Sequence, residues 1–95
     1  MLVTVGIAKC SDGRMRIEVQ RPQASARAEK SYADAQAVAT VLSNFGIPQN
    51  TIEYFVRLLP DLDINHVLTF PPMHVSSHQL ACEDFRIAAA VSGPQ

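Results

Sequence analysis

Two histidines and a cysteine recur at every fourth position near the end of the sequence, within the stretch MHVSSHQLACEDF. His74, His78 and Cys82 are residue types that bind zinc, which accepts imidazole and thiolate ligands and usually needs four of them. If a helix begins after Ser76, His78 and Cys82 lie one turn apart on the same side of it. The spacing therefore predicts part of a zinc site.

An ordinary helix start also explains these residues. Cys82 falls near the same apolar arc as Phe85, which is typical of a small buried side chain. His78 would lie in the first helical turn, where the helix dipole disfavours a cation, so a neutral surface histidine is expected there. A fourth zinc ligand would have to be His66 or Cys10. We therefore expect no cofactor, and keep zinc held by the three spaced residues as an alternative.

Recognition of nucleic acid is a second alternative, because residues 35–59 predict a pair of helices joined by a tight turn. The exposed side of the second helix would carry Gln49 and Asn50, whose amides can read base edges. Arg57 is the one basic residue there, and Glu53 one turn earlier can pair with it.

Basic side chains elsewhere offer a different contact with phosphates. Arg14 and Arg16 should line the outer face of a β-hairpin, and strands of that kind do bind nucleic acid in some proteins. The net charge of −1 nevertheless provides no positive excess to attract a polyanion. Nucleic acid is therefore not the favoured partner.

Common catalytic motifs do not occur in the sequence. The four glycines are scattered, so there is no phosphate-binding loop, and no Gly-x-Ser-x-Gly elbow is present. An enzyme is thus less favoured than a binding protein.

Length and composition place further bounds. The 95 residues, 47% of them hydrophobic, fit one globular domain spanning residues 1–95. Two cysteines are too few for a disulfide scaffold, which favours a reducing, cytoplasmic location. No apolar run approaches the roughly 20 residues that span a bilayer, so no membrane partner is expected.

The fold class predicted from these patterns is α+β, beginning with a β-hairpin over residues 1–20. Apolar residues alternate on both sides of a turn that contains Gly13. A three-residue loop with Gly13 in the left-handed region pairs Val5 with Val19 and Ile7 with Ile17, which puts all four on one face. Residues 21–30 are predicted to be a linker.

A helical hairpin is predicted for residues 31–60. Ser31 would cap the first helix, and Gly46 would stop it with Ile47 packing back. The second helix would begin at Pro48 or be capped by Asn50.

A third strand and a C-terminal element are predicted for residues 64–91. The strand would run over residues 64–70 and end at two prolines. Ser76 and Gln79 then form a capping box for a C-terminal helix reaching Val91. Because residues 85–91 also alternate, a short helix followed by a strand is the alternative.

A small non-catalytic module for protein interaction or self-assembly is the function these observations favour. The fraction of hydrophobic residues is large for a chain of this length, and some of these side chains should remain exposed and form an interface. Tyr54, Arg57 and Leu58, on the outer side of the second helix, are the candidate contact residues, because Tyr and Arg are enriched in interfaces. The expected partner is another copy of the chain or another protein.

Overall fold

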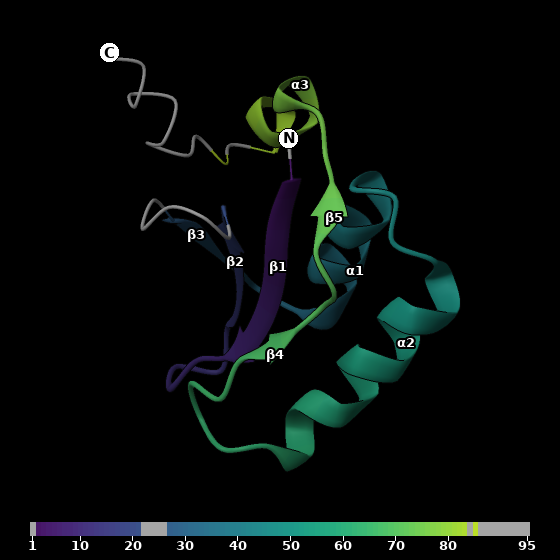
Figure 1. Ribbon diagram of the computed structural model, residues 1–95. Coiled ribbons are helices and arrows are strands. Elements are labelled where there is room, and N and C mark those ends of the chain that lie inside the picture. Colours follow the sequence, from purple (N-terminus) through teal and green to yellow (C-terminus); the bar gives the residue numbers. More distant parts are fainter. Residues whose placement is uncertain (1, 22–26, 84, 86–95) are drawn as a thin grey trace.

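The computed structural model describes residues 2–21, 27–83 and 85, and it shows an antiparallel sheet with two of its helices packed on one side and a third at one end (Figure 1). The elements in chain order are β1 (Leu2–Lys9), β2 (Met15–Gln20), β3 (Arg27–Tyr32), α1 (Ala35–Asn44), α2 (Gln49–Leu58), a 3-10 turn (Leu59–Asp61), β4 (Leu68–Thr69), β5 (Met73–His74) and α3 (Ser77–Cys82). The strand order is β3-β2-β1-β4, and β5 also pairs with β1. The predicted α+β class is confirmed.

The β1–β2 hairpin has the register that the apolar pattern predicts. Val5 lies opposite Val19 and Ile7 opposite Ile17, and all four side chains are fully buried. Gly13 has a φ of +86°, in the left-handed region that a three-residue loop requires. A two-residue loop would have moved the apolar side chains of one strand to the opposite face.

β3 lies where the sequence predicts a linker, so that prediction is wrong for residues 27–30. The strand pairs with β2 along its whole length, with Ala28 opposite Val19 and Lys30 opposite Ile17. Its core-facing positions are Ala28, Lys30 and Tyr32, so only the last has a large ring and the regular apolar alternation of a half-buried strand is missing. Charged residues are common on strands at a sheet edge. Residues 22–26 lie outside the described residues.

The first helix begins later than predicted, because Asp34 and not Ser31 caps it. The carboxylate of Asp34 accepts a hydrogen bond from the backbone N–H of Ala37 at 2.9 Å. Ser31 belongs to β3. The helical hairpin therefore occupies residues 35–58 of the predicted 31–60.

The turn between α1 and α2 forms as predicted. Gly46 has a φ of +94°, and the N–H of Ile47 donates to the carbonyl of Leu42 at 3.2 Å. This pattern satisfies the last carbonyls of α1 and buries Ile47 against the core. α2 follows directly after Pro48, and Asn50 lies inside the helix rather than at its cap.

The predicted strand over residues 64–70 is reduced to the two residues of β4. Asn65 has a φ of +68°, and its N–H donates to the carbonyl of Lys9 at 2.8 Å, so the chain turns here instead of extending. The two prolines stop β4, as predicted, but the chain then pairs with β1 again as β5. That second pairing has no signature in the sequence.

The capping box at the start of α3 is confirmed, since the side chain of Ser76 accepts from the N–H of Gln79 and the side chain of Gln79 accepts from the N–H of Ser76. The helix ends at Cys82, which corrects the expectation of a helix to Val91 and agrees with the short-helix alternative. The strand proposed for residues 85–91 lies outside the described residues, apart from Phe85.

One core joins the sheet to the helices. α1 contacts β2 and β3, and the 3-10 turn after α2 contacts β1. The buried apolar side chains come from every layer: Val3, Val5, Ile7, Ala8, Ile17, Val19, Val38, Val41, Leu42, Phe45, Ile47, Ile52, Leu59, Phe70, Val75, Leu80 and Phe85. Across the residues that the structure describes, every helix is too short or too polar to traverse a bilayer.

Candidate functional site

The outer side of α2 carries the residues that the sequence singles out for contact. Tyr54 is 60% exposed, the largest exposed fraction among the large hydrophobic residues described. Arg57 is exposed and Leu58 is half-buried. Together with Glu53 these residues form what we call the α2 face, which lies opposite the buried Ile52.

Two aromatic rings pack between Tyr54 and the core. The rings of Tyr54 and Phe55 meet edge to face with centroids 6.0 Å apart. Phe55 in turn stacks on Phe70, with centroids 4.2 Å apart and planes at 15°. Phe70 is 1% exposed, so the row of three rings runs from the surface into the core. Contacts of this kind hold Tyr54 on a rigid base.

An apolar groove opens beside the N-terminal turn of α2. Its volume is about 280 Å³, and its wall contains no charged side chain. Phe70 is shared between the groove and the row of rings. The lining residues are Gly46, Ile47, Pro48, Thr51, Phe70, Pro71, Pro72 and Met73.

The two charged side chains of the α2 face, Glu53 and Arg57, do not form an ion pair with each other. The carboxylate of Glu53 accepts a hydrogen bond from the amide of Gln49 at 3.3 Å, rather than the expected ion pair with Arg57. Every ion pair among the described residues lies on the sheet, and none includes Arg57. The guanidinium of Arg57 is therefore available to a carboxylate from another molecule.

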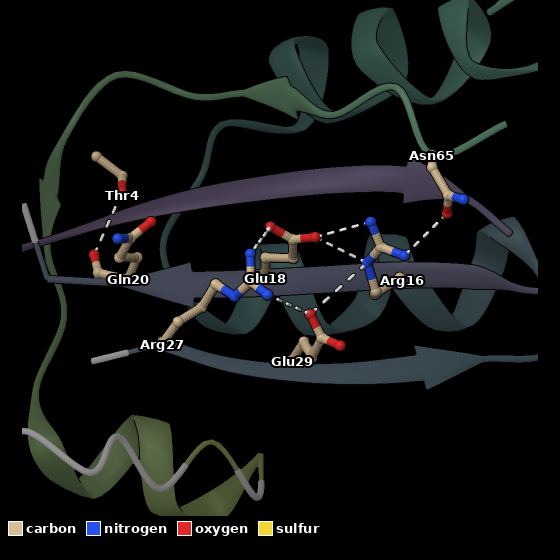
Figure 2. Close-up of polar contacts among 7 residues, drawn as sticks. All are labelled: Thr4, Arg16, Glu18, Gln20, Arg27, Glu29 and Asn65. Atoms are coloured by element: carbon tan, nitrogen blue, oxygen red, sulfur yellow. Dashed lines mark hydrogen bonds and ion pairs between the residues drawn. The ribbon is translucent and has the colours of Figure 1, made fainter. Parts of the chain in front are cut away.

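The outer face of the sheet carries its own charge network (Figure 2). Arg16 pairs with Glu18 at 2.8 Å and approaches Glu29 at 4.0 Å, and it donates to the side chain of Asn65 at 3.1 Å. Arg27 lies 3.6 Å from Glu18 and 3.5 Å from Glu29. Two cations thus face two anions, so the network itself has no net positive charge to attract phosphates.

The residues proposed for nucleic-acid binding do not form one surface. Arg14 donates to the backbone carbonyl of Ser31 at 3.3 Å, beside the hairpin loop. Gln49 and Asn50 lie in the first turn of α2, on the helical side of the sheet (Figure 1). Arg16 is on the opposite side, within the charge network of Figure 2.

The predicted zinc ligands are brought together only in part. The Sγ atom of Cys82 lies 3.5 Å from Nε2 of His78, and both residues are exposed. His74 belongs to β5. Within residues 2–21, 27–83 and 85 no cluster of three or more His, Cys, Asp or Glu side chains has the arrangement of a metal site.

Sequence reasoning missed the groove and the ring stack, because Phe55 and Phe70 are 15 positions apart and their contact depends on how α2 crosses the sheet. The double proline after Phe70 is a local hint, since proline has no N–H to donate and so interrupts the strand there. Comparison of the chain with protein-family models, with curated proteins and with solved structures gave no match.

Proposed function

We propose that this protein is a self-assembling module whose copies pair through the α2 face. The observation that carries the proposal is the exposed Tyr54 ring, held on the Phe55–Phe70 stack, whose Phe70 ring also lines an uncharged groove. A large, rigid, amphipathic ring on a firm base is typical of an interface anchor, because little conformational entropy is lost when it is covered.

The charge pattern of the α2 face suits a second copy of the same chain. In a two-fold interface residue i contacts residue j and j contacts i. If two α2 helices pack antiparallel with the axis beside Phe55, Arg57 of each copy lies opposite Glu53 of the other. Both copies then gain an ion pair, and Tyr54 of one lies near Leu58 of the other.

The groove provides a place for the second copy's Leu58. Thr51 of the N-terminal turn lines the groove, and Leu58 belongs to the last turn of the same helix. Antiparallel packing brings the last turn of one α2 beside the first turn of the other. The half-buried Leu58 would leave water for an uncharged pocket, which is favourable by about 25 cal/mol for each Å² of apolar surface covered.

The contact should be weak. α2 has ten residues and is therefore about 15 Å long, so the interface falls at or below the usual range for stable complexes, about 1,200 Å². We expect a dissociation constant on the order of 10–100 µM. We further propose a reducing, cytoplasmic setting, in which the free thiols of Cys10 and Cys82 persist.

Solution mass across a range of concentrations tests the proposal, with Tyr54→Lys as the disrupting variant. We expect the wild type to move from monomer to dimer between about 1 µM and 1 mM, and Tyr54→Lys to weaken the dimer at least about 10-fold, since it puts a charge against Leu58. Ile64→Lys is the matched control, because Ile64 is also exposed, at 51%, but lies outside the α2 face. A monomer at all concentrations, or equal effects of the two variants, would contradict the proposal.

A further inference from the structure

The pair formed by His78 and Cys82 has the separation of two ligands on one tetrahedral zinc ion. Zinc–nitrogen bonds of about 2.05 Å and zinc–sulfur bonds of about 2.3 Å, at a tetrahedral angle, place N and S about 3.6 Å apart. In this protein Nε2 of His78 and Sγ of Cys82 are 3.5 Å apart. The two side chains thus reach this spacing without any rearrangement of α3.

Among the described residues, none near His78 and Cys82 supplies a third zinc ligand. Glu83, the neighbour of Cys82, accepts a hydrogen bond from the amide of Asn44 at 2.8 Å and so faces α1. No group of three metal-binding side chains occurs in the described part of the chain. Because His78 and Cys82 are both exposed, another molecule can approach them.

We propose that two copies of this chain share one zinc ion, each contributing His78 and Cys82. A two-fold axis through the ion completes a Cys₂His₂ set, which is a common closed, four-coordinate zinc site. Each Cys82 binds as a thiolate and gives its proton to solvent, so zinc binding weakens as the pH falls. The site does not exist in a single copy, and zinc therefore links copies through α3.

This pairing is independent of the one proposed for the α2 face, because it uses a different helix. Tyr54→Lys is accordingly the background for the test, since it removes the other contact. If self-association through α2 fails, the zinc site can still be found, and the reverse also holds.

The experiment is a zinc titration of Tyr54→Lys, prepared without a histidine tag and kept reduced by a phosphine so that no disulfide forms. We expect calorimetry to give one zinc per two chains, and the solution mass to double on adding zinc and to return with a chelator. Cobalt(II) in place of zinc should show the visible bands of a tetrahedral thiolate site, which a purely structural role of the pair would not produce.

Variants assign the ligands. His78→Gln and Cys82→Ser should each weaken zinc binding by more than about 100-fold and abolish the mass change, a larger effect than replacing a residue that only hydrogen-bonds to a metal ligand. His74→Gln and Cys10→Ser are the matched controls and should leave both readouts unchanged. The proposal is overturned by one zinc per chain with no change of mass, by equal losses in the controls, or by no binding at micromolar zinc.

Discussion

The rings of Phe55 and Phe70 lie stacked, with centroids 4.2 Å apart and planes at 15°. The contact joins the middle of α2 to the residue that follows β4, so it fixes the helix relative to the sheet. It also underlies Tyr54, whose ring meets the edge of Phe55. The core and the proposed interface therefore depend on the same pair.

A double-mutant cycle on this pair measures the stack itself. Phe55→Leu and Phe70→Leu should each lower the free energy of unfolding, and Phe70→Leu more so because its ring is almost fully buried. The coupling between them should be about 0.5–1.5 kcal/mol, as for other aromatic pairs. Urea denaturation of the four proteins gives the value. Strictly additive losses would mean that the rings contribute through burial alone.

Gly6 is expected to tolerate no side chain while Val67 is in place. A Cβ atom at position 6 would lie 2.6 Å from a methyl carbon of Val67 and 3.4 Å from the carbonyl of Leu68. Gly6→Ala should therefore lower the free energy of unfolding by about 1–3 kcal/mol, although alanine is otherwise no worse than glycine in a strand. Val67→Ala added to Gly6→Ala should recover part of that loss. A double variant as unstable as the sum of the single changes would refute the proposed clash.

The residue that caps the N-terminus of α1 is Asp34 in the structure, whereas the sequence predicted Ser31. Asp34→Ala should cost about 1 kcal/mol of unfolding free energy, because the N–H of Ala37 loses its acceptor. Ser31→Ala should change stability by less than about 0.5 kcal/mol, since Ser31 is an exposed strand residue. Thermal and urea denaturation provide both values, and the reverse order of effects would favour a helix beginning at residue 31.

Strong local patterns were sufficient to predict much of the fold. Alternation along β1 and β2, with Gly13 between them, determines their register because any slip would expose the core face. Gly46 likewise ends α1 because a left-handed residue is needed there. β3 was not predicted because an edge strand needs few apolar residues. The next predicted strand is shortened because Asn65 has a positive φ, a backbone conformation that apolar periodicity does not indicate.

The candidate site was predictable to the extent that it lies on one helix. Tyr54, Arg57 and Leu58 share a turn of α2, so their common location follows from helical spacing. Their surroundings are harder to predict. Glu53 accepts a hydrogen bond from Gln49 in place of the expected ion pair with Arg57, and the groove depends on how the residues after Phe70 pack beside α2. For the same reason the sequence placed His78 beside Cys82 but could not give their separation.

A charge reversal and its compensation test the self-assembly account most directly. Sedimentation equilibrium should give a dimer for the wild type at high concentration. Arg57→Glu should weaken it more than about 10-fold, because two carboxylates then face each other across the two-fold axis. The double variant Glu53→Arg, Arg57→Glu restores opposite charges and should return the dissociation constant to within about threefold of the wild-type value. If the double variant associates no better than Arg57→Glu, or if all three proteins have the same mass at every concentration, the antiparallel α2 pairing is contradicted.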